Sequence, residues 1–126
     1  MIRHIVLLQI PSHIARDKID SMFDQLQQIA LAMPGTVAFF SGANMPGSGL
    51  HQGFTHVINI DFIDETARDT YVAELDRDRI GGRLLEMTEG GLGGILIMNI
   101  NLDHVRTRDN DNEPGVKSHK PQLRWV

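Results

Sequence analysis

The chain has 126 residues, a formal net charge of −4 and no cysteine. This length predicts one domain with a core that needs no cross-links, and the missing cysteines exclude disulfides, thiolate metal ligands and cysteine nucleophiles. Residues 103–126 hold five Lys/Arg and four Asp/Glu, which leaves a net charge of −5 in residues 1–102 and argues against nucleic acid as a partner.

The first ten residues predict a strand and give no sign of a targeting segment. Apolar residues occupy both alternating sets of positions, as in a central strand covered on both faces. The run from Ile5 to Ile10 is interrupted by Gln9 and is too short for a signal peptide, and no segment approaches the roughly 20 apolar residues of a membrane span. We therefore expect a soluble, cytoplasmic protein.

An amphipathic helix is predicted over residues 15–33, where apolar residues recur at spacings of three and four. Pro11 ends the preceding strand, and Ser12 is the candidate cap of this helix. Pro34-Gly35 ends the helix, because glycine readily adopts the left-handed cap conformation.

Two strands follow, separated by a glycine-rich loop. Residues 36–42 are rich in β-branched and aromatic side chains, and residues 54–62 alternate between two faces. Residues 44–53 carry three glycines and a proline and predict the loop of a hairpin.

The last part of the domain predicts two helices and a strand. Asp64 begins a helix that extends to about Leu75, and residues 76–79 predict a charged turn. A short helix over residues 80–88, a glycine-rich connection and a strand over residues 95–102 complete the pattern.

This order of elements predicts an α+β fold of the ferredoxin-like βαββαβ kind, with a four-stranded antiparallel sheet. Helices then cover one sheet face only, so the apolar residues Ile5, Leu7 and Val57 on the other face need a cover. A second copy of the chain is the simplest cover, which predicts a homodimer. Residues 103–126 are polar and lack apolar periodicity until the last four residues, so we expect a flexible tail outside a domain of residues 1–102.

Three segments resemble the stress-responsive A/B barrel proteins: MIRHIVLL, MPGTVAFFSGAN and GFTHVINIDFIDETARDTYV. That family begins with a comparable R/K-H-hydrophobic strand and carries G-F/Y-T-H at its third strand. The resemblance covers about residues 1–102 and implies a dimeric α+β barrel.

The resemblance also implies candidate activities. Most members have no assigned activity, one plant member is a polyketide cyclase that needs no cofactor, and related barrels include antibiotic-biosynthesis-type monooxygenases. The cyclase's strand-one histidine matches His4, and its helix tyrosine matches Tyr71. Its second histidine falls within residues 75–78, where the best-aligned residue is Arg77, which is no general base at neutral pH.

His4 and His56 lie on neighbouring predicted strands, and three roles are open to them. They are structural core residues, an acid/base pair, or two ligands of a metal for which no third ligand is evident. Tyr71 has two possible roles: its hydroxyl donates a hydrogen bond to a bound carbonyl or phenol, or its ring packs in the core. Arg77 clamps an anion, or lies in a solvated turn.

A set of apolar residues from the first helix and strand either lines a ligand cavity or fills the core, namely Val6, Leu8, Phe23 and Leu26. We expect a homodimer that binds a small apolar or aromatic ligand, without metal or cofactor. The alternative is a cofactor-free enzyme, polyketide cyclase-like or monooxygenase-like, in which His4 is the acid/base and Tyr71 orients the substrate. A purely structural dimer is the third possibility.

Overall fold

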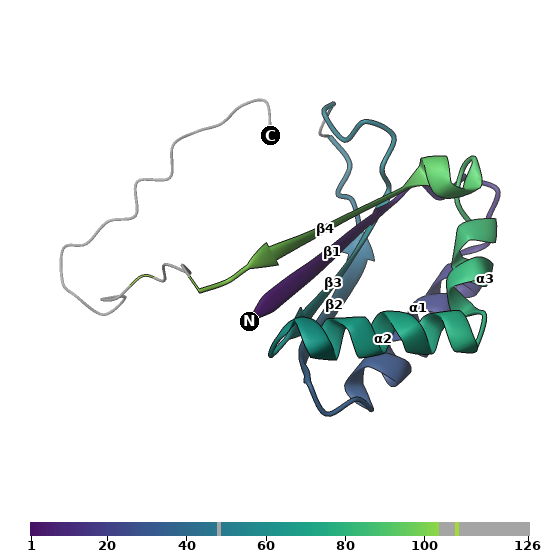
Figure 1. The fold of residues 1–126 in the computed structure, drawn as a ribbon. Coiled ribbons are helices and arrows are strands. Elements are labelled where there is room, and N and C mark those ends of the chain that lie inside the picture. The colour runs from purple at the N-terminus through teal and green to yellow at the C-terminus, as the bar shows by residue number, and fades with distance from the viewer. Residues whose placement is uncertain (48, 104–107, 109–126) are drawn as a thin grey trace.

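The computed structural model describes residues 1–47, 49–103 and 108. It contains four strands and three α-helices, with one 3₁₀ helix (Figure 1). In chain order these are β1 (Ile2–Leu8), α1 (Arg16–Leu31), β2 (Thr36–Ala43), β3 (His56–Phe62), α2 (Glu65–Arg77), α3 (Ile80–Glu86), η1 (Gly91–Gly94) and β4 (Ile95–Asn101).

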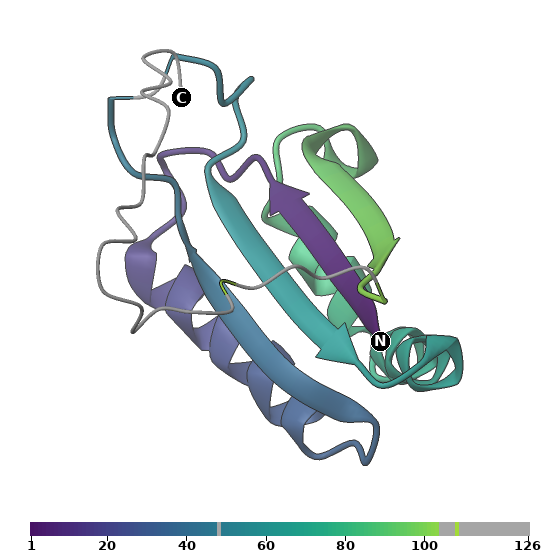
Figure 2. The same cartoon turned by 90° about the vertical axis from the view of Figure 1, so that its left-hand side faces the viewer.

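The strands form one antiparallel sheet in the order β2-β3-β1-β4. All three α-helices lie on the same side of it, and Figure 2 looks onto the opposite side, where the strands are not covered by any helix. The predicted ferredoxin-like α+β fold is confirmed, with α3 and η1 inserted in the connection between α2 and β4.

The alternation along β1 separates the two faces of the sheet. Ile2, His4, Val6 and Leu8 are buried under the helices, whereas the residues between them are half-buried on the open face. The core forms where these β1 residues meet β3 and the apolar stripe of α1. Its largest fully buried side chains are Leu8, Leu26, Ile58, Ile60, Phe62 and Met87.

Two local predictions about helix ends are wrong. The first helix begins at Arg16, with Ala15 at the N-cap position and no side-chain cap, so Ser12 does not cap it. The second helix extends to Arg77 and so includes two residues predicted to lie in a turn. The half-buried Glu74 and the exposed Arg77 form an ion pair at the i,i+3 spacing that helices favour, which a search for apolar periodicity does not detect.

The open face of the sheet carries exposed apolar side chains from β2, β3 and β4, next to the half-buried Ile5 and Leu7 of β1. Phe40 and Met98 are each 55% exposed, and Val57, Leu96 and Ile100 are between 37% and 40% exposed. Arg3 lies on the same face and donates two hydrogen bonds, of 2.8 and 2.9 Å, to the carboxylate of Asp61. This ion pair holds the pKa of Asp61 below its ordinary value.

The predicted tail, residues 103–126, lies outside the described residues except for Asp103 and Arg108. The predicted domain boundary at residue 102 therefore stays a prediction. None of the helices among the described residues is both long and apolar enough to cross a membrane.

Candidate functional site

A cavity of about 260 Å³ lies between the helices and the β1–β4 half of the sheet. Most of its lining residues come from β1, α2, α3 and β4. One further residue comes from each of α1, β3 and η1. Only three of its lining residues carry a polar side chain, namely His4, Tyr71 and Asp76. The cavity is therefore apolar with a few polar groups, as ligand pockets usually are.

The cavity opens along the edge strand β4. Ile97 faces the helices but is 51% exposed, so the helices do not cover this part of the sheet. Val72 on α2 and Leu92 in η1 also line the cavity and are exposed. These three apolar side chains form the rim of the opening.

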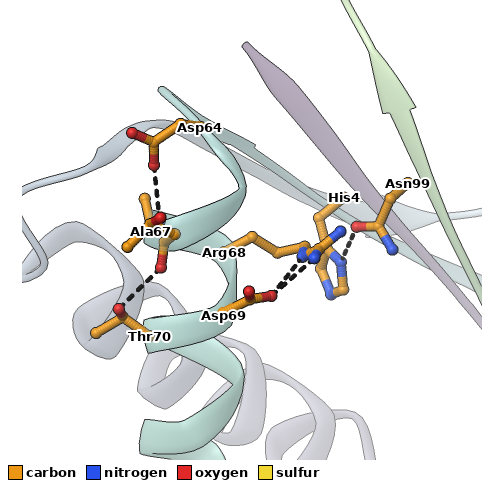
Figure 3. Close-up of polar contacts among 8 residues, drawn as sticks. His4, Asp64, Ala67, Arg68, Asp69, Thr70 and Asn99 are labelled. Carbon is orange, nitrogen blue, oxygen red and sulfur yellow. Dashed lines mark hydrogen bonds and ion pairs between the residues drawn. The ribbon is translucent and has the colours of Figure 1, made fainter.

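His4 is held in one orientation at the inner wall of this cavity. It is 5% exposed and lies beside Asn99 in the β1–β4 register. Its Nδ1 is 2.7 Å from Oδ1 of Asn99 (Figure 3). An amide oxygen only accepts, so Nδ1 carries the proton and donates it to this bond, which leaves the lone pair on Nε2. Among the described residues, Asn99 is the only hydrogen-bond partner of the ring.

The surroundings of His4 keep it neutral. Burial lowers the pKa of the imidazole, and this effect exceeds the opposing effect of the hydrogen bond to Asn99. The positive charge of Arg68 lowers the pKa further. At neutral pH, Nε2 is therefore a hydrogen-bond acceptor and a free base.

Tyr71 lies on the inward side of α2, close to His4. It is 2% exposed, and its ring makes an edge-to-face contact with the imidazole at a centroid distance of 6.2 Å. Burial raises the pKa of the phenol well above its ordinary value, so the hydroxyl keeps its proton. This hydroxyl has no hydrogen-bond partner within the described part of the chain, and it is not fully enclosed, because Oγ1 of Thr36 is the only fully buried side-chain oxygen without a partner there.

Arg68 and Asn99 complete the polar end of the site, and the sequence analysis missed both. Figure 3 shows the Arg68 guanidinium extending from α2 toward His4. It donates hydrogen bonds of 3.0 and 2.7 Å to the carboxylate of Asp69, and only 23% of its side chain is exposed. Its position one turn before Tyr71 on an amphipathic helix is the only sequence signal that indicates it.

The structure brings four of the predicted site residues together and separates the others. His4, Val6, Leu26 and Tyr71 line the same cavity. Leu8 does not line it and packs fully buried in the core. Arg77 is exposed beside Glu74 and does not contact the cavity.

His56 and His4 do not form a pair. In the β1–β3 register His4 lies opposite Ile60, whereas His56 lies opposite Leu8, so the two histidines are about 13 Å apart along the strands. His56 lies with Phe23 in a second groove of about 930 Å³ between the start of α1 and the β2–β3 end of the sheet. Its Nδ1 is 2.7 Å from Oγ1 of Thr55, and its ring packs edge-to-face on Phe23.

The donor set does not indicate a metal. Within residues 1–47, 49–103 and 108, no three His, Asp or Glu side chains are close enough to hold an ion. The polar groups at the His4 end of the cavity are a neutral imidazole, a protonated phenol and a neighbouring guanidinium.

The burial of His4 generates a prediction about pH. Because its pKa is lowered in the folded state, the unfolded chain takes up a proton near pH 6.5 before the folded chain does. The free energy of unfolding is therefore fully present above about pH 6.5 and decreases as the pH falls below it. Urea denaturation measures this free energy. Between pH 7.5 and pH 5, the free energy of unfolding is expected to decrease less in His4→Gln than in the wild type.

Two comparisons make this test specific. His51→Gln, at an exposed loop position, is the control for the loss of an imidazole. Asp61 affects the free energy of unfolding in a separate pH range. A carboxyl with a lowered pKa in the folded state loses its stabilising contribution only below about pH 4. Equal slopes in His4→Gln and the wild type would contradict the assignment of His4 as a buried neutral base.

Comparison with known proteins places this chain in a family. The model of the stress responsive A/B barrel domain matches residues 2–92, and no curated protein matches the chain. A dimeric ferredoxin-like protein of unknown function from Jannaschia sp. CCS1 is 26% identical, with a TM-score of 0.71 over 79% of this chain and 97% of that one.

Two further solved structures share the fold at lower identity. The hydroxynitrile lyase of Passiflora edulis is 16% identical, with a TM-score of 0.67 over 84% of this chain and 96% of that one. SnoaB, a cofactor-independent oxygenase from Streptomyces nogalater, is 12% identical, with a TM-score of 0.65 over 82% and 94%. With the family model matching most of the described domain, this chain belongs to the stress responsive A/B barrel family.

Proposed function

We propose that this protein binds a small apolar or aromatic molecule in the cavity beside His4. One observation carries the proposal: two otherwise buried side chains in a mainly apolar cavity wall, His4 and Tyr71, each have a polar atom, Nε2 and the hydroxyl, that has no partner among the described residues and is open to the cavity. Buried polar groups are normally hydrogen-bonded. A ligand that bonds to both would satisfy them.

The size of the cavity favours a single substituted ring. An engineered apolar cavity of about 150 Å³ is enough for benzene, and typical ligand pockets begin near 300 Å³. At about 260 Å³ this cavity has room for a ring with short substituents.

The polar groups favour a ligand with a hydroxyl. Nε2 of the neutral His4 accepts a hydrogen bond, and the protonated Tyr71 donates one. A phenol or an enol offers both a donor and an acceptor at one oxygen. The guanidinium of Arg68 nearby favours a ligand whose oxygen carries partial negative charge.

An alternative role is that of a cofactor-free enzyme acting on an aromatic or polyketide-like substrate. The neutral lone pair of His4 favours it, because Nε2 can take a proton from a hydroxyl or from a carbon next to a carbonyl. The substrate would become an oxyanion or enolate and His4 an imidazolium, whose Nδ1 proton Asn99 still accepts. Tyr71 would donate to the new oxyanion, and Arg68 would stabilise its charge.

A homodimer is the assembly that fits the open face of the sheet. Apolar side chains from β2, β3 and β4 are exposed there, and the Jannaschia neighbour is described as dimeric. A second copy would bury this face, as sheet-on-sheet packing does. The cytoplasmic location and a role in stress stay predictions.

The binding proposal predicts that 4-ethylphenol binds to the wild type and that Tyr71→Phe weakens this binding by about fivefold to tenfold. The expected loss is that of one hydrogen bond to a buried hydroxyl, about 1–1.5 kcal/mol. Isothermal titration calorimetry measures both affinities. Ethylbenzene, which lacks the hydroxyl, is the matched control and is expected to bind equally to both proteins. The proposal would be overturned if Tyr71→Phe weakened the binding of both ligands equally, or if the wild type bound neither ligand.

The enzyme alternative predicts proton abstraction without an added cofactor. Incubation of the wild type with 4-hydroxyacetophenone in D₂O is expected to exchange the methyl protons next to the carbonyl, as followed by proton NMR. His4→Gln is expected to reduce the rate by at least about 100-fold, which is typical for the loss of a general base. If exchange persists in His4→Gln, another group is the base; if the wild type gives none above buffer, the enzyme alternative fails for this substrate class.

The dimer proposal predicts sedimentation at twice the chain mass of 14.1 kDa. Met98→Lys places a charge on the open face and is expected to shift the protein toward the monomer, because an unpaired charge is costly to bury. Leu31→Lys, at an exposed apolar position on α1, is the control and is expected to remain dimeric. A wild type that sediments as a monomer at micromolar concentration excludes the dimer.

A further inference from the structure

Helix α3 contains two adjacent glycines, although it has only seven residues. Glycine is a poorer helix former than any residue except proline. Gly81 and Gly82 both line the cavity, and Gly81 is half-buried, whereas Gly82 is exposed at its outer edge. The pair thus weakens a helix that forms one wall of the proposed binding site.

Some other glycines of the domain have a local reason, although Gly42, Gly49, Gly82 and Gly93 do not. A side chain at Gly35 would overlap the Cβ of Ala67, and one at Gly94 would overlap the carbonyl oxygen of Glu89. Gly90 and Gly91 have φ angles of 71° and 63°, which favour glycine.

Gly81 has neither reason. Its φ is not positive, and a Cβ built on it would meet no atom within 4 Å. Packing and backbone conformation therefore both permit a side chain at this position. Gly81 is also a half-buried residue of the cavity wall.

An independent feature of the same cavity indicates a ligand. Tyr71 is 98% buried, lines the cavity, and has a hydroxyl without a partner among the described residues. The cavity therefore combines a polar group that needs a partner with a wall that lacks a side chain.

We propose that Gly81 determines the width of ligand that the cavity accepts, and that the ligand class extends to flat, fused-ring phenols. This inference rests on the proposed binding function. The missing side chain widens the cavity beside α3, so that a second ring fits next to the first. A methyl group at this position narrows the cavity and strengthens the helix at the same time.

The test compares Gly81→Ala with the wild type, using 4-ethylphenol and 2-naphthol as probes and calorimetry for both affinities. Gly81→Ala is expected to weaken the binding of 2-naphthol by at least about tenfold, because a rigid ring cannot avoid the added methyl group. The same substitution is expected to weaken the binding of 4-ethylphenol by less than about threefold, because a single ring has room to shift. The melting temperature is expected to rise by about 2–5 °C, because alanine favours the helix.

Gly49→Ala is the matched control, because Gly49 lies in the loop before β3, outside the cavity, and a Cβ there also meets nothing within 4 Å. It is expected to keep both affinities at the wild-type value. Gly81→Leu extends the series, since its larger side chain is expected to abolish 2-naphthol binding.

The outcomes separate this inference from the binding function. If the wild type binds 4-ethylphenol and Gly81→Ala binds both probes as the wild type does, Gly81 does not set the width, and the binding function stands. If the wild type binds 4-ethylphenol and not 2-naphthol, the fused-ring class is wrong. A lower melting temperature in Gly81→Ala also overturns the inference, because the space would not be free. If the wild type binds neither probe, the binding function itself fails.

Discussion

The hydrogen bonding of β1 on both of its edges determines the rest of this molecule. β3 and β4 flank β1, so its alternating side chains divide the whole sheet into a helix-covered face and an open face. The same register places His4 beside Asn99 on β4, and this neighbour orients the imidazole. A shift of one residue would move His4 to the open face and expose the core.

The cavity exists because the helices cover the sheet unevenly. α1 packs its apolar stripe on β1 and β3, whereas the edge strand β4 keeps Ile97 half exposed on the helix side. Two glycines in α3 leave further space. The resulting site has a neutral imidazole and a protonated phenol in apolar surroundings, where each hydrogen bond to a ligand is stronger than in water.

The sequence alone predicts the fold well because periodicity and turn residues report burial directly. It also identifies His4 and Tyr71, through their alternation and helix position and through the family resemblance. It fails where the answer depends on register or on polar pairing. His56 shares a sheet face with His4. The strand register, however, places His56 opposite Leu8 and His4 opposite Ile60, so the two histidines are not neighbours. Arg68, Asn99 and Gly81 become part of the site through tertiary placement, and no motif marks them.

The most direct test of this account is ¹⁵N NMR of the His4 side chain at pH 7.5, before and after saturation with 4-ethylphenol. The account predicts a neutral ring with the proton on Nδ1, held by Asn99, and an unprotonated Nε2. Addition of the phenol is expected to shift mainly the Nε2 resonance, because Nε2 accepts the hydrogen bond of the ligand. A doubly protonated ring at this pH, a proton on Nε2, or resonances that do not respond to the phenol would contradict the assignment of this cavity as the binding site.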